Sequence, residues 1–214
     1  MKITLFITIF ILVLAMVSCE AASLESSEID PNLLFQDDFS DPASSWDDFQ
    51  DEYGATQYRQ GTYQILVNEP NTDLWANPSN LIFTDTQIEV EAERMGGSSN
   101  NIFGIICRYQ DPANFYQLLV SSDGYYDISK VQNNSRVPLT AEQLLPSDKI
   151  PQNEEPLKIR ADCIGDTLTL YVDDQQIAVT QDDDFSSGNI GLIAGAYQEA
   201  GTDIAFDNLV VRRP

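Results

Sequence analysis

The 214-residue sequence contains no histidine, only 11 Lys and Arg, and three cysteines. The absence of histidine excludes Ser-His-Asp and Cys-His catalysis and every histidine-ligated metal site. With 34 Asp and Glu the net charge is −23, which argues against nucleic acid as a partner because phosphate binding needs clustered Lys and Arg. Hydrophobic residues nonetheless make up 43% of the chain. The composition therefore predicts one folded domain with a short tail rather than disorder.

The one long apolar run covers residues 3–17 and follows Lys2. It is shorter than the roughly 20 residues of a membrane-spanning helix but suits the hydrophobic region of an export signal. The run ends at Ser18 and Cys19, which resembles a bacterial lipobox with Met16 in place of the usual Leu. We therefore expect residues 1–19 to be a lipoprotein signal peptide in which Cys19 is lipidated. An ordinary secretory signal with an incidental cysteine is the alternative.

Residues 20–32 are small, polar and acidic without periodicity, which predicts a flexible tether. Removing the leader deletes Lys2 and no acid, so the net charge of −23 falls to −24. Such a charge repels anionic lipid headgroups, so the acyl chain would be what anchors the protein to the membrane. The predicted location is the bacterial cell envelope.

Beyond residue 32, apolar and polar residues alternate with the period of two that is typical of β-strands. In residues 86–94, Ile88, Val90 and Ala92 share one face and three glutamates share the other. The dipeptides Asp-Gly at 123–124 and Gly-Asp at 165–166 predict tight turns between such runs. The predicted strands are residues 33–39, 61–67, 86–94, 102–109, 115–120, 125–131, 157–163, 167–172, 176–180, 189–197 and 203–212.

About ten to twelve short strands at hairpin spacing predict an all-β domain over residues 33–214, a sandwich or barrel of antiparallel sheets. The one helical turn that we expect lies at residues 140–145. The predicted core face of residues 102–109 consists of Phe103, Ile105, Cys107 and Tyr109.

Several short motifs, taken in their order and spacing, are similar to those of a known superfamily. They are DDFSDP (37–42) with Trp46, GIICRYQD (104–111), NFY (114–116), DGYY (123–126), LTLYVDD (168–174), FSSGNIGL (185–192) and FDNLVV (206–211). Together they resemble the concanavalin A-like lectin/glucanase superfamily, nearest to the laminin-G-like and 3-keto-disaccharide hydrolase-like domains of bacterial envelope proteins. The resemblance covers residues 33–214 and implies a jelly-roll β-sandwich of two curved antiparallel sheets. It implies no single activity, because lectins, glycosidases and adhesion modules share this fold.

An acidic strand supplies the strongest indication of catalysis. Laminarinase-type glycosidases of the superfamily carry Glu-x-Asp-x-Glu, which Glu89, Glu91 and Glu93 resemble. Retaining hydrolysis needs two carboxyl groups about 5–5.5 Å apart, one with a raised pKa. Here Glu91 replaces the middle aspartate and the usual aromatic neighbours are missing. Because strand alternation alone also aligns three acids, a solvated strand face is the favoured interpretation and catalysis is the alternative.

The resemblance also implies a structural cation. In the jelly roll the first and last strands are neighbours, which brings Asp37 and Asp38 near Asp207. Members of the superfamily often hold Ca²⁺ near those ends, and Ca²⁺ takes six to eight oxygen ligands. We therefore expect a Ca²⁺ site that includes Asp38 and Asp207, the alternative being that each Asp caps a turn or faces water. The acidic residues 182–184 are expected to form a solvated loop.

Cys107 and Cys163 both fall on the apolar side of their strands. The resemblance places these strands close together, and an exported protein meets an oxidising environment. We therefore predict a Cys107–Cys163 disulfide, with two buried thiols as the alternative.

Aromatic residues supply the binding hypothesis, since sugars stack their C–H faces on flat rings. Candidate rings are Trp46, Trp75, Tyr109, Tyr116, Tyr125, Tyr126 and Tyr197. Trp46 is expected in the core and Trp75 in an exposed loop. Tyr125 and Tyr126 are adjacent on a strand and point to opposite faces, so only one of them can be core. Trp75, Tyr125 and Tyr126 are the predicted ligand-binding residues, and the acidic charge favours a neutral glycan.

Three functions remain open on the sequence. The first is an envelope-anchored lipoprotein with a non-catalytic glycan-binding or adhesion module. The second is a glycoside hydrolase, laminarinase-like or 3-keto-disaccharide hydrolase-like, and the third is a structural lipoprotein without a small ligand. The absence of histidine and the altered acidic motif favour the first and third over the second.

Overall fold

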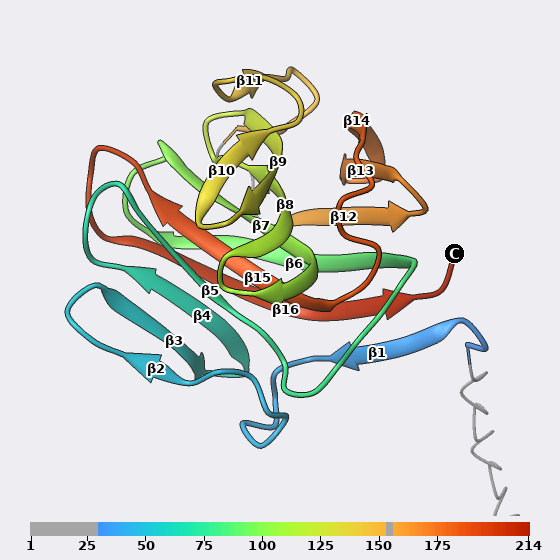
Figure 1. The fold of residues 1–214 in the computed structure, drawn as a ribbon. Helices are drawn as coiled ribbons and strands as arrows, with labels where there is room; N and C mark the ends of the chain where they lie inside the picture. Colours follow the sequence, from blue (N-terminus) through green and yellow to red (C-terminus); the bar gives the residue numbers. More distant parts are fainter. Residues whose placement is uncertain (1–29, 153–155) are drawn as a thin grey trace, which may run out of the picture. The chain divides into compact units, whose positions relative to one another are not determined.

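The alternating segments form strands that pair into two antiparallel sheets in the computed structural model (Figure 1). The structure describes residues 30–152 and 156–214. Cys19, the predicted signal peptide and all but the end of the predicted tether lie outside these residues. Pro31–Pro214 form one compact unit. No helix long and apolar enough to cross a membrane occurs in the described part of the chain.

The larger sheet has nine strands, and the last strand of the chain lies near its centre. In spatial order the sheet contains β14 (Gln175–Gln181), β13 (Thr167–Val172), β12 (Leu157–Ile164), β6 (Thr86–Gly96), β16 (Thr202–Arg212), β4 (Thr62–Val67), β3 (Gly54–Arg59) and β2 (Phe49–Gln50). Strand β1 (Leu33–Asp37) pairs with the second half of β16, so the first and last strands are neighbours as the resemblance implied.

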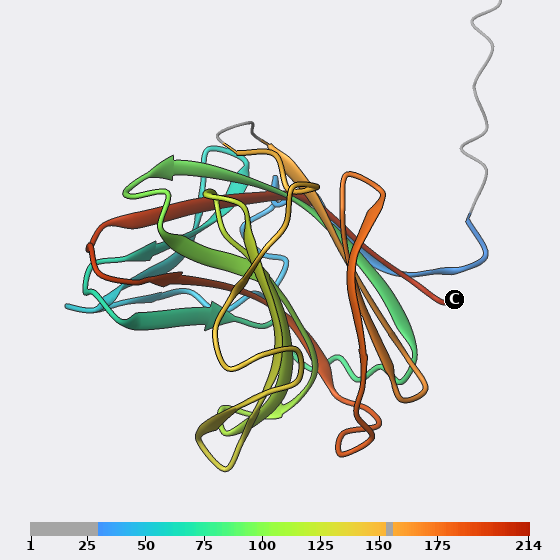
Figure 2. The same ribbon diagram turned by 90° about the horizontal axis from the view of Figure 1, so that it is seen from above.

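The smaller sheet has seven strands and carries most of the cavities described below. Its order is β10 (Ser135–Pro138), β9 (Tyr125–Gln132), β8 (Asn114–Val120), β7 (Asn101–Asp111), β15 (Asn189–Ala196) and β5 (Thr72–Ala76). The short β11 (Leu145–Pro146) also pairs with β9. It pairs with Tyr125 and Tyr126 at the start of β9, whereas β10 pairs with residues 129–132 at its end. The segment between β10 and β11, golden yellow in Figure 2, therefore loops out from the edge of this sheet and comes back to it.

The core lies between the two sheets and follows the predicted alternation. Ile88 and Val90 of β6 and Phe103 and Ile105 of β7 are fully buried. Cys107 of β7 is bonded to Cys163 of β12, with 6.8 Å between their Cα atoms. The predicted disulfide is therefore confirmed, and it connects the seven-stranded sheet to the nine-stranded one.

A β-bulge in β7 makes one part of the predicted core face wrong. Arg108 has a φ of 51°, and the register of β7 against β8 shifts between Cys107 and Asp111. The extra residue turns Arg108 inward, where it is 2% exposed and its Nη1 donates to the carbonyl of Phe185 at 2.8 Å. Tyr109 consequently moves to the outer face of the sheet.

The N-terminal motif forms an aromatic corner of the core. The carboxylate of Asp37 accepts hydrogen bonds from the backbone N–H of Phe39 at 2.8 Å and from Nε1 of Trp46 at 3.0 Å. The Trp46 ring then packs against Phe39 and Tyr63, with centroids 5.5 and 5.3 Å away. The prediction that Trp46 belongs to the core is confirmed.

Two local predictions are wrong. Residues 140–145 contain no helical turn, because Leu139 and Thr140 donate their N–H groups to the carbonyl of Ile128 and hold the segment against β9. The acidic loop 182–184 is not simply solvated. The side chain of Lys130 points inward from β9 and is only 6% exposed. A buried ammonium group must be paired, and Asp182 and Asp184 form ion pairs with it.

Candidate functional site

The outer face of the seven-stranded sheet, which points away from the core, is unusually apolar. A second buried cluster lies there, consisting of Ile102, Ile106, Phe115, Leu119 and Ile193. The rings of Trp75, Tyr109 and Tyr197 and the side chain of Leu144 pack against it. A solvated sheet face usually carries polar residues, so this face is partly covered and is a candidate binding surface.

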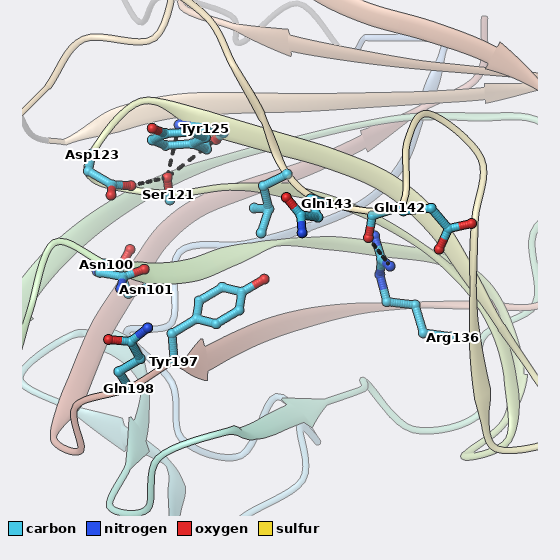
Figure 3. A pocket seen from close by; sticks show the side chains of 11 residues that line it. Asn100, Asn101, Ser121, Asp123, Tyr125, Arg136, Glu142, Gln143, Tyr197 and Gln198 are labelled. Atoms are coloured by element: carbon cyan, nitrogen blue, oxygen red, sulfur yellow. Dashed lines mark hydrogen bonds between the residues drawn. The ribbon is translucent and has the colours of Figure 1, made fainter.

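Two adjoining cavities lie over this face, and together we call them the groove. The larger has a volume of about 630 Å³ and includes Tyr125, Gln143 and Gln198 in its lining. The smaller has about 220 Å³ and includes Asp73, Gln117 and Asp127. Arg136, Leu144 and Tyr197 line both. Figure 3 shows the ring of Tyr197 rising into the larger cavity between Tyr125 and Arg136.

A hydrogen-bonded turn positions Tyr125 at one wall of the groove. Ser121 and Tyr125 exchange backbone and side-chain hydrogen bonds, Tyr125 N–H donating to Oγ of Ser121 at 2.9 Å. Gly124 has a φ of 91°, a conformation that suits glycine in the predicted Asp-Gly turn. Tyr125 is 39% exposed. Tyr126 points the other way and packs against the main core, as alternation predicted for one of the two.

An ion pair fixes the opposite wall. Arg136 forms two contacts with Asp127, at 2.9 and 3.3 Å, and the Asp127 carboxylate is nearly fully buried. Ser129 donates to the same carboxylate at 2.6 Å. Arg136 also donates to the backbone carbonyl of Glu142 at 3.2 Å. Because Glu142 lies in the segment between β10 and β11, this arginine holds that segment, with Leu144, over the sheet.

The floor of the groove places one carboxylate beside a glycine. A Cβ on Gly195 would lie 2.1 Å from Oδ1 of Asp73, so a larger residue at this position would displace that carboxylate. Asp73 is an exposed residue of the edge strand β5, but desolvation by the neighbouring side chains raises its pKa, and the nearby Arg136 partly opposes the shift. Burial also raises the pKa of Tyr197. The charge of Arg136 opposes this shift, and the charges of Asp73 and Asp127 add to it. The Tyr197 hydroxyl is therefore a neutral group at physiological pH, able to donate and accept hydrogen bonds.

The predicted loop position of Trp75 is wrong, because Trp75 lies in β5 at the edge of the seven-stranded sheet. Its ring packs on Phe115, with centroids 5.6 Å apart. It also lines a third cavity of about 440 Å³ beside the groove. Of the three predicted binding residues, Tyr125 thus lies in the groove, Trp75 beside it, and Tyr126 in the core packing.

The acidic strand lies on the other sheet. Glu89, Glu91 and Glu93 are on β6 and alternate with core residues, so they point away from the core of the nine-stranded sheet. Arg160 and Lys158 of β12 stand directly opposite Glu89 and Glu91 in the strand register. None of the three glutamates lines the groove. The ion pairs of these two bases go to other acids, Lys158 to Asp174 at 2.7 Å and Arg160 to Asp162 at 3.1 Å.

Asp38 and Asp207 are near enough for the charge of Asp38 to affect the pKa of Asp207. Hydrogen bonds from Ser40, at 2.7 and 3.1 Å, lower the pKa of Asp38. Burial raises the pKa of Asp207, a hydrogen bond from Asn208 opposes it, and Glu91 and Asp38 add to it by charge repulsion. Within residues 30–152 and 156–214, no group of three or more Cys, Asp or Glu side chains is arranged to hold a metal ion. The Ca²⁺ site stays a prediction.

Several solved structures of other proteins have a fold similar to that of this chain. The chain resembles the carbohydrate-binding module CBM66 of Bacillus subtilis, with a TM-score of 0.62, 19% identity, and coverage of 79% of this chain and 96% of that one. It also resembles a galectin-like protein of unknown function from Bacillus subtilis, with a TM-score of 0.60, 10% identity, and coverage of 85% and 96%. The β-glucanase of Bacillus licheniformis is a further similar structure, with a TM-score of 0.58 and 10% identity. The match covers 84% of this chain and 97% of that one. The chain has the concanavalin A-like β-sandwich fold.

Sequence comparisons are less extensive. No protein-family model matches the chain. A TPR repeat-containing protein of Treponema pallidum (strain Nichols) is 33% identical over 98 residues, which is 46% of this chain. The chain spans only 11% of the length of that curated relative.

Sequence reasoning missed most of the groove. Tyr197 was among the candidate rings, but Asp73, Arg136 and Leu144 carried no motif. One signal was available. The chain has only 11 Lys and Arg, so Arg136, which follows the predicted strand at residues 125–131, stands out as a candidate. The other residues are brought together only by the order of strands in the sheet.

Proposed function

We propose that the chain is a non-catalytic carbohydrate-binding module that takes a neutral glycan in the groove. The observation that carries this proposal is the pair of rings, Tyr125 and Tyr197, in one cavity with amide side chains around them. The cavity's volume of about 630 Å³ is within the usual range for small-molecule sites. Tyr125 offers an exposed ring, and Tyr197 stands on an apolar sheet face.

Polar groups around the rings match the needs of a sugar. Asn100, Gln143 and Gln198 line the larger cavity, and each amide can both donate to and accept from a hydroxyl group. Structures of similar fold support the proposal, because one is a carbohydrate-binding module and another is a β-glucanase. The groove thus combines an apolar stacking surface with hydrogen-bonding groups at its rim.

The charge of the groove supports a neutral ligand. Four acids line it, which are Asp73, Asp123, Asp127 and Glu142, against one base, Arg136. Arg136 is already paired with Asp127. A sulfated or uronic glycan would therefore be repelled both locally and by the net charge of −23.

Two features support binding without hydrolysis. Asp127, the most buried groove acid, is held by Arg136 and Ser129 and is not a free general acid or base. The acidic strand with Glu89 and Glu93 points outward from the other sheet. We further propose that Cys19 carries lipid and that the tether presents the module on the bacterial cell envelope.

A glycan array tests the proposal, using the purified chain from Glu20 onward. We expect neutral glycans to bind with dissociation constants on the order of 10 μM to 1 mM, as for a shallow site with one or two stacking rings. Tyr197→Ala should weaken that binding about tenfold or more. Tyr53→Ala is the matched control, because Tyr53 is 49% exposed and lines neither cavity of the groove.

Two results would contradict the proposal. The absence of any hit on a broad neutral panel would favour a structural lipoprotein. Release of sugar from a bound glycan, lost in Glu89→Gln, would instead favour the hydrolase.

A further inference from the structure

The third cavity lies where the two sheets meet at the edge of the sandwich. Its lining comes from β5 of the seven-stranded sheet, from β2 and β3 of the nine-stranded sheet, and from the residues just before β2. We propose that this cavity is a second subsite for the same neutral glycan, so that the ligand is a chain of several sugar units rather than a single terminal sugar. This inference rests on the proposed function of the groove.

Continuity between the groove and the third cavity is the first argument. Asp73 lines the groove and Trp75 lines the third cavity. Both belong to β5, two residues apart, and therefore point to the same face about 6.5 Å from each other. Their partners on β15 are Gly195 and Ile193, which lie on that same face. A ligand that extends along β5 from the groove would therefore reach the Trp75 ring.

The aromatic content of the cavity is the second argument. Phe49 is 46% exposed, on a strand of only two residues. Trp75 faces the same cavity and is held in place from behind by Phe115. A ring that is already fixed loses little conformational entropy on binding, which favours stacking against a sugar.

Hydrogen-bonding groups at the cavity are the third argument. Asp47 and Asp48 line it and are exposed. The backbone carbonyl of Asp47 accepts from Oγ1 of Thr56 at 3.1 Å, and its Oδ2 accepts from N–H of Asn77 at 3.2 Å, which fixes this acid between the two sheets. Carboxylates can accept hydrogen bonds from sugar hydroxyls. Like the groove, this cavity would repel anionic sugars.

A length series tests the subsite. The probes are neutral gluco- and fructo-oligosaccharides of two to six units, titrated by calorimetry against the chain from Glu20 onward. We expect affinity to rise about tenfold or more with length, and Phe49→Ala to remove this gain while leaving the disaccharide affinity unchanged. Tyr53→Ala, which alters a similarly exposed ring outside the cavity, should retain the gain.

The outcomes separate this inference from the proposed function. Binding that does not depend on length, or a Phe49→Ala variant that keeps the gain, would overturn the subsite and leave the groove as the binding site. Trp75→Phe checks the same point by shrinking the second ring, and it should reduce the affinity for six units more than for two. A failure of every oligosaccharide to bind would overturn both proposals.

Discussion

Reducing the Cys107–Cys163 disulfide should lower the free energy of unfolding substantially. The two residues are 56 positions apart, and a cross-link closing a loop of this size is worth about 4 kcal/mol in the chain-entropy treatment. Both cysteines are fully buried, so the reduced side chains can stay packed as small apolar groups. The loss therefore comes mainly from the greater freedom of the unfolded chain.

Urea unfolding of the oxidised and reduced protein measures this effect. The free energies extrapolated to water should be compared rather than the midpoints, because a cross-link also changes the surface that unfolding exposes. The Cys107→Ala/Cys163→Ala double variant should resemble the reduced protein and should not respond to reductant. A difference below about 1 kcal/mol between the oxidised and reduced protein would refute the reasoning, and so would two free thiols in the unfolded, unreduced chain.

Three further predictions concern charge and anchoring. Lys130→Met should destabilise the fold by about 2–4 kcal/mol, because it leaves partly buried carboxylates unpaired. Burial raises the pKa of Asp182, but hydrogen bonds from Lys130 and Tyr116 outweigh it and lower that pKa overall. The stabilisation is therefore present above about pH 4 and lost as pH falls through the lowered pKa, so urea titrations should show the variant and wild type converging in acid. Because burial and neighbouring acids raise the pKa of Asp207, Asp207→Asn should raise the melting temperature at pH 7 without Ca²⁺. The predicted Ca²⁺ site implies that Ca²⁺ at a hundredfold excess over its Kd stabilises wild type by about 2.7 kcal/mol and this variant much less. Identical melting curves of wild type with Ca²⁺ and with chelator would contradict the site. Cys19→Ala should block lipid labelling in cells, and a variant still cleaved at the same bond and membrane-bound would contradict the lipoprotein prediction.

Local alternation was enough to predict much of the fold. Ile88, Val90 and Ala92 are all buried as predicted, because a strand places every second residue on one face whatever sheet it joins. The same parity placed Cys107 and Cys163 in the core, and the motif resemblance brought their strands together. The sequence did not reveal β3 or β5 as strands, since neither carries a clear alternation.

The tertiary structure alone decided where the groove lies. Tyr109 changed face because a bulge at Arg108 added one residue to the strand, an event that alternation cannot anticipate. Tyr125, Arg136 and Tyr197 meet because β9, β10 and β15 share one sheet and the segment after β10 folds back onto it. Period-two patterning specifies which side of a strand is apolar, but the groove depends on strand order and on pairing between residues far apart in the sequence, which no local pattern encodes.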